Sequence, residues 1–177
     1  PGWYASLFSG ASLALFAILA GLIVRGVAFE FWGKHDSPRW RATWEWGLVI
    51  GSLVPALLWG VAWANIVRGL PLDANHDMAG SFFDLLSPYA LLGGVASLAL
   101  FIAHGAVFLT LRTRGELLDR SRAAARRTTP IAALAVIAFL AWTLVNQGRD
   151  GGLEPLSVAF AVGGAALVAL APALVGR

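Results

Sequence analysis

The sequence contains no cysteine and few charged residues, and each shortage excludes a class of protein. Without cysteine the chain cannot form a disulfide, use a thiolate nucleophile or hold zinc through thiolates. Lysine, arginine, aspartate and glutamate make up 13% of its 177 residues, which is about half the share found in soluble domains. Its hydrophobic residues, 58% of the total, outnumber the interior positions of a soluble domain of this size. A water-soluble globule is therefore excluded.

Long runs without any charged residue are the dominant pattern. Five of them have about the 20 residues that a helix needs to cross a bilayer, whereas membrane strands are half as long and alternate in polarity. The sequence Ser87–Pro88 predicts a break near the start of the third run. The prediction is an all-α integral membrane protein, a single polytopic transmembrane helix bundle over residues 1–177. Its five expected spans cover residues 5–27, 44–68, 85–111, 130–148 and 155–176.

Basic residues gather on alternate connections, which predicts the orientation of the chain. Residues 25–43 carry four lysines and arginines and residues 112–129 carry six, so these two loops hold ten of the thirteen. Basic loops face the cytoplasm, and the first residue is therefore expected outside. The loop at 112–129 is expected to contact anionic membrane lipid, not nucleic acid, because its arginines are tethered to the bilayer. Tryptophans lie within the first loop and directly after it, as at a membrane surface: Trp32, Trp40, Trp44 and Trp46.

Three ionisable residues near the first basic loop are candidates for a proton route. Arg25 ends the first apolar run, either as an arginine that extends to the membrane surface or as a buried cation lining a proton or ion route. Glu30 follows it. Glu45 begins the second run, where it either interacts with the positive helix N-terminus or pairs with Arg41 or Arg25. Both alternatives stay open for Arg25 and for Glu45.

His104 is the one ionisable residue in the middle of a run. It could ligate haem, carry a proton or donate to a neighbouring helix, and its small neighbours Ala103 and Gly105 favour the helix contact. The glycine pairs Gly93–Gly94 and Gly163–Gly164 are also expected at helix contacts. No residues have the spacing of metal ligands or of a catalytic triad, so no catalytic residue and no metal site is predicted.

Several short motifs follow one another along the first three predicted spans. They are RGVAFEF at 25–31, WEWG at 44–47, GLPL at 69–72, FFDLLSPYALLGG at 82–94 and RTRGEL at 112–117. In this order they resemble subunit II of the cytochrome bd-type quinol oxidases. The resemblance covers residues 9–127, and the last two runs match only as apolar spans.

The resemblance implies a multi-pass subunit of a complex in the bacterial inner membrane that oxidises quinol and reduces dioxygen to water. It places the haem b and haem d groups and the quinol on subunit I, the expected partner, and no cofactor on this chain. Membrane lipid is a further expected partner, and the resemblance leaves room for a small accessory membrane subunit. The chain would be an accessory scaffold that contributes to a cytoplasmic proton route.

The resemblance also bears on individual residues. Arg25 falls on an arginine that the family associates with the proton route, and Glu30 falls on an acidic position shortly after it. The family's first two helices, with a His-Trp-Asp motif, and several later helices have no counterpart here, so a middle piece of a longer subunit is expected. Two alternatives stay open: a multi-span secondary transporter, for which the inverted repeats are missing, and a purely structural membrane scaffold.

Overall fold

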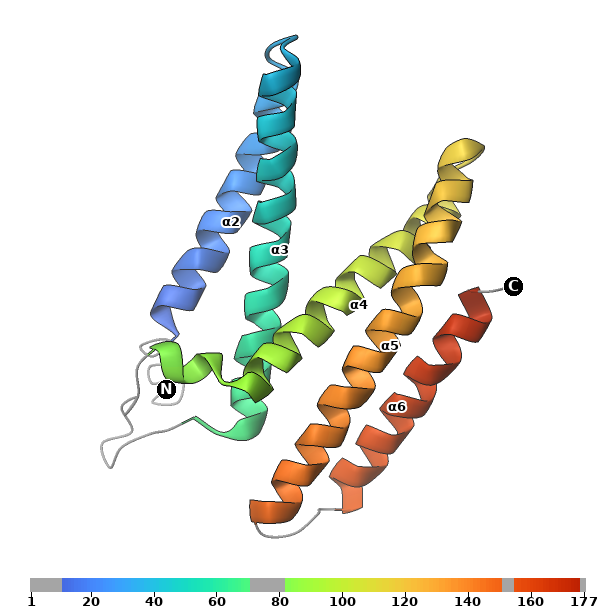
Figure 1. The fold of residues 1–177 in the computed structure, drawn as a ribbon. Helices are drawn as coiled ribbons and strands as arrows, with labels where there is room; N and C mark the ends of the chain where they lie inside the picture. Colours follow the sequence, from blue (N-terminus) through green and yellow to red (C-terminus); the bar gives the residue numbers. More distant parts are fainter. Residues whose placement is uncertain (1–10, 71–81, 151–154, 176–177) are drawn as a thin grey trace. The chain divides into compact units, whose positions relative to one another are not determined.

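Helices make up almost all of the described part of the chain. The computed structural model describes residues 11–70, 82–150 and 155–175, and these ranges contain no strand (Figure 1). The all-α fold class is confirmed. Residues 5–10, where the first span was expected to begin, lie outside the described residues. The elements are α2 (Ser12–Phe31), α3 (Pro38–Arg68), the 3₁₀ helix η1 (Phe82–Leu86), α4 (Pro88–Arg112), α5 (Glu116–Asp150) and α6 (Pro155–Val175).

Four helices, α2 to α5, are long and apolar enough to cross a membrane, and α6 contains a shorter apolar stretch, Ser157–Ala171. Large apolar side chains face outward: Phe16 is 68% exposed and Leu134 is 70% exposed. The positions with no exposure at all are alanines, including Ala28 and Ala125. In lipid, apolar side chains can face the acyl tails while small residues let helices approach. This distribution supports the polytopic membrane bundle.

The predicted basic loops are largely helical, which corrects the expected bounds. The loop expected at 25–43 shrinks to residues 32–37, because α2 continues to Phe31 and α3 begins at Pro38. Ser37 has an extended backbone, and Pro38 occupies the first helical position, where proline lacks only an N–H that would be unpaired anyway. The first charged residue of the sequence marks the end of an apolar run. It does not mark the end of the helix, because backbone hydrogen bonds continue past that residue into the charged segment.

The same correction applies at 112–129, where α5 begins at Glu116 and runs through Pro130. Gly115 has φ +61°, a left-handed turn that glycine adopts at no steric cost, and its carbonyl accepts from the amides of Leu118 and Asp119. Glu116 pairs with Arg120 at 2.6 Å one turn later. The connection between α4 and α5 is therefore the three residues 113–115.

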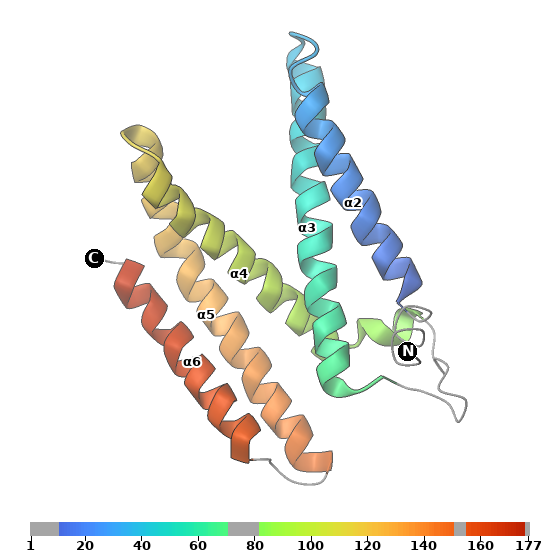
Figure 2. The same cartoon turned by 180° about the vertical axis from the view of Figure 1, so that it is seen from behind.

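The chain forms two compact units, residues 1–94 and 95–177. In the first, α2 and α3 lie side by side as an antiparallel hairpin (Figure 2). In the second, α5 and α6 lie side by side (Figure 1). The glycine predictions divide between the units. A Cβ on Gly94 would lie 2.8 Å from Val61 Cγ2, which confirms a close helix contact. In the second pair, a Cβ on Gly163 would meet no described atom within 4 Å, whereas one on Gly164 would lie 3.9 Å from Leu140 Cδ1 of α5, an ordinary van der Waals contact.

Candidate functional site

Arg25 lies at the seam between α2 and α3. The helices approach so closely there that a Cβ on Gly51 would lie 2.5 Å from the Gly21 carbonyl oxygen, 2.9 Å from the Arg25 backbone nitrogen and 3.0 Å from Arg25 Cβ. Only glycine at position 51 leaves space for the α2 backbone. The Arg25 side chain itself is exposed, and among the described residues it forms no ion pair.

The tip of the α2–α3 hairpin is the connection at residues 32–37. Trp32 lies at its start, just beyond the end of α2. Its Nε1 donates to Glu45 Oε1 of α3 at 3.3 Å. Arg25 precedes Trp32 by seven residues, which at 1.5 Å per residue places its Cα about 10 Å further along α2 from the tip. The arginine is therefore two helical turns away from the level of the tip tryptophans.

Aromatic rings pack together at this tip, around the short connection. The ring centroids of Phe31 and Trp44 are 5.3 Å apart and those of Trp40 and Trp44 are 5.6 Å apart. Trp40 Nε1 also donates to the Phe31 carbonyl oxygen at 2.7 Å. The Arg41 guanidinium lies over the Trp32 ring at 5.4 Å. Indole rings beside basic groups are typical of the headgroup layer of a bilayer, so the tip has the chemistry of a membrane surface.

Both candidate carboxylates lie near the tip and have partners other than Arg25. Glu30 Oε1 is 2.8 Å from Lys34 Nζ in an exposed pair, and Glu45 accepts the hydrogen bond from Trp32. Arg41, the other expected partner of Glu45, instead pairs with Asp36 at 2.6 Å. The hairpin thus brings the three proton-route candidates onto one pair of helices, with the two acids at the tip and the arginine deeper.

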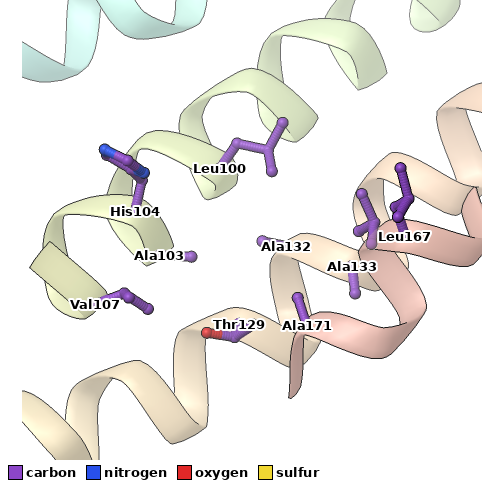
Figure 3. A pocket seen from close by; sticks show the side chains of 10 residues that line it. Leu100, Ala103, His104, Val107, Thr129, Ala132, Ala133, Leu167 and Ala171 are labelled. Carbon is purple, nitrogen blue, oxygen red and sulfur yellow. The ribbon is translucent and has the colours of Figure 1, made fainter. Parts of the chain in front are cut away.

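His104 lies in the second compact unit, on α4, at the edge of a pocket of about 460 Å³ between α4, α5 and α6. Its imidazole is exposed and points away from Ala132 and Ala133 on the far side of that pocket (Figure 3). A haem iron inside the pocket would have no nitrogen directed at it, so these residues do not fit a haem there. Among the described residues, no group of three His, Cys, Asp or Glu could hold a metal ion. The role of His104 as a helix contact stays a prediction.

Asn65 is a structural residue that the sequence reasoning missed. It is only 5% exposed on α3, and its side-chain amide donates to the Val61 carbonyl at 2.9 Å and to the Leu85 carbonyl at 2.8 Å. It thereby joins η1 to α3 within the first compact unit. A single amide in an otherwise apolar run was the available signal, because a polar group in a membrane helix needs a partner.

Comparisons with known proteins identify the family of this chain. The family described as "Cytochrome bd terminal oxidase subunit II" matches residues 1–177, so the likeness extends past residue 127 into the last two helices. The chain is 41% identical over 157 residues to "Cytochrome bd-I ubiquinol oxidase subunit 2" of Escherichia coli strain K12, which covers 85% of the chain and 40% of that relative.

Two further relatives come from other bacteria. "Cytochrome bd ubiquinol oxidase subunit 2" of Bacillus subtilis is 40% identical over 141 residues, covering 80% of the chain and 42% of the relative. "Probable cytochrome oxidase subunit 2" of Haemophilus influenzae is 40% identical over 152 residues, covering 84% and 40%. The chain spans about two fifths of the length of these relatives. The family match over its full length shows that the chain belongs to the cytochrome bd terminal oxidase subunit II family.

Proposed function

We propose that this chain is part of the accessory subunit of a bd-type terminal oxidase that oxidises quinol and reduces dioxygen to water. The family match over residues 1–177 carries this proposal, and two of the relatives are named as ubiquinol oxidase subunits. The chain packs against a haem-bearing subunit I in the bacterial inner membrane. The connections at 32–37 and 113–115 face the cytoplasm, in keeping with the basic residues around both.

Within this complex the α2–α3 hairpin contributes to a route for protons from the cytoplasm. Glu30 and Glu45 lie at the tip, at the level of the tryptophans, where they can exchange protons with water. Arg25 lies about 10 Å deeper, and a guanidinium offers only donors and no acceptor for a proton. It therefore does not relay protons. It would hold a fixed positive charge that attracts carboxylates and orients water beside the seam.

The position of Arg25 supports this role more than that of a surface anchor. A charge within a membrane helix costs about 2.5–3.5 kcal/mol near the middle of the bilayer, less toward its surface, and such residues commonly mark ion or proton paths. The basic residues at the tip, including Lys34 and Arg41, already supply ion pairs and a stacking contact at the surface. Arg25 lies away from them, with no ion pair among the described residues.

The experiment replaces Arg25 with leucine in the full-length protein assembled with its partner, and measures quinol-driven oxygen consumption and proton uptake. Arg39→Leu is the matched control, because Arg39 is an exposed arginine on the tip side of α3. We expect Arg25→Leu to lower turnover at least tenfold with haem content and assembly preserved, and the control to stay within twofold. Unchanged turnover in Arg25→Leu would leave the chain as a structural scaffold without a part in proton transfer.

The haem groups and the quinol are assigned to the partner subunit. An absorption spectrum of the full-length protein purified without its partner tests this assignment directly. We expect no stoichiometric haem, and a haem bound through side chains of this chain would overturn the division of roles. Substrate uptake into vesicles that hold this protein alone would instead favour a transporter.

A further inference from the structure

The pocket in the second compact unit has one apolar wall from each of three helices. Leu100, Ala103 and Val107 of α4 face Thr129, Ala132 and Ala133 of α5, and α6 supplies the third wall. Val107, Thr129 and the α6 residue Ala171 lie together at one end (Figure 3). A volume of about 460 Å³ is within the range of sites that hold small organic ligands. The pocket is open on one side, so a long apolar chain could enter it from the membrane.

Thr129 is the feature of this pocket that helix packing leaves unexplained. It is 7% exposed, and its hydroxyl has no hydrogen-bond partner among the described residues. Other hydroxyls of α5 donate to a carbonyl of the preceding turn, as Thr128 does to Ala124 at 2.9 Å and Thr143 does to Phe139 at 2.8 Å. In Figure 3 the Thr129 oxygen is turned toward the α4 side of the pocket. A buried hydroxyl without a partner indicates an acceptor supplied from elsewhere.

Two arginines of α5 precede Thr129 on the same side of the helix. Arg126 and Arg122 precede Thr129 by three and seven residues, so they share its side of α5. Both are exposed, and they begin about 4.5 Å and 10.5 Å further along the helix axis. On α4, Arg112 follows Val107 by five residues, which places it about 140° around the helix, and its guanidinium lies over Phe108, a residue that does not line the pocket. Two cations, Arg122 and Arg126, thus lie beyond the hydroxyl on its own side of α5.

We propose that this pocket is a specific site for an anionic phospholipid of the cytoplasmic leaflet. One acyl chain lies in the apolar groove, an ester carbonyl accepts from the Thr129 hydroxyl, and the phosphate contacts Arg122 and Arg126. The order of groups along the pocket matches the order along a phospholipid, from acyl chain through glycerol ester to phosphate. The charge of the two arginines selects the anionic class. The site acts independently of the proton route and of quinol oxidation.

The test uses native mass spectrometry of the full-length complex titrated with phosphatidylglycerol and, separately, with phosphatidylcholine. The double variant Arg122→Gln/Arg126→Gln removes both proposed phosphate contacts. Its matched control, Arg120→Gln/Arg127→Gln, removes the same charge from the opposite side of α5. Each direct hydrogen-bonded contact to the phosphate contributes about 1 kcal/mol, so losing two of them should lower phosphatidylglycerol affinity about thirtyfold in the first variant. In the control we expect a loss of about threefold or less.

Two further variants separate the site from general attraction to the membrane. Thr129→Val keeps the shape and removes the hydroxyl, and it should weaken phosphatidylglycerol binding several-fold. Ala103→Leu fills the groove and should abolish binding of the tightly held lipid. If this variant fails to assemble, the arginine and threonine variants alone test the proposed site. Equal losses from both arginine pairs, or equal affinity for phosphatidylcholine, would overturn the proposal. So would a quinone, or a further helix of the full-length protein, occupying the groove.

Discussion

Replacing Gly51 with alanine tests whether the α2–α3 seam positions Arg25. The added Cβ would lie 2.5 Å from the Gly21 carbonyl oxygen and 2.9 Å from the Arg25 nitrogen. Ordinary contacts between such atoms are about 3.5 Å, so the helices must separate by roughly 1 Å at this level. Both clashing atoms belong to the backbone of α2, which cannot rotate away as a side chain could.

The expected cost follows from two opposing effects. Overpacking a tight contact costs about 1–3 kcal/mol, and the rigid backbone places this site near the upper value. Alanine regains up to about 1 kcal/mol through its higher helix propensity. The net destabilisation should therefore be about 2 kcal/mol. Because the clash also involves Arg25 Cβ at 3.0 Å, oxygen consumption should fall together with stability.

The glycines of the hairpin and of α4 supply graded controls for this experiment. A Cβ on Gly94 would approach Val61 Cγ2 to 2.8 Å, one on Gly21 would approach Pro55 Cδ to 3.1 Å, and one on Gly26 would meet no described atom within 4 Å. Melting temperatures of the purified complex should therefore fall most for Gly51→Ala, then for Gly94→Ala and Gly21→Ala, and least for Gly26→Ala. If the Gly51 and Gly26 variants unfold at the same temperature, the close approach of the helices is not a property of the assembled protein.

Two further predictions concern the architecture of the chain. Asn65→Leu should lower stability by about 1–2 kcal/mol, because the buried Leu85 carbonyl loses its donor. Ser52→Ala, which removes an exposed hydroxyl that bonds only within α3, should change the melting temperature little by comparison. Single cysteines at Lys34 and Arg114, in a background without other cysteines, should react with a membrane-impermeant maleimide only from the cytoplasmic side. A cysteine at Gly152, between α5 and α6, should react only from the opposite side, and labelling of all three from one side would refute the orientation.

The fold class followed from the sequence because apolar length is a direct requirement of the bilayer. The uncharged runs located the four helices α2 to α5 and also α6, whose apolar stretch Ser157–Ala171 is shorter. The helix bounds were less predictable, since charge ends a run but not a helix: α5 begins fourteen residues before the predicted start at Pro130. The pairs Ser37–Pro38 and Gly115–Glu116 were the signals that marked the true starts.

The candidate site was less predictable than the fold, because it depends on which helix faces touch. The sequence showed Arg25 and Gly51 as separate features of two runs, and only the packed hairpin shows that one lies against the other. The partners of the acids also depend on the tip, where Trp32 reaches Glu45 and Lys34 reaches Glu30. No spacing rule specifies such contacts across a turn whose length was itself mispredicted.

The seam finally gives a way to separate a functional Arg25 from a structural one. The α3 backbone lies against Arg25 Cβ. The guanidinium therefore has no space between α2 and α3 and extends outward from the edge of the hairpin. If it only anchors the helix, Arg25→Leu should lower both stability and turnover. If it is kept as an intramembrane charge for proton transfer, leucine removes a cost of up to about 2.5–3.5 kcal/mol, so stability should hold or rise while turnover falls. Melting temperature and oxygen consumption of the same preparation distinguish the two, and a parallel decline in both would refute the proton-route assignment.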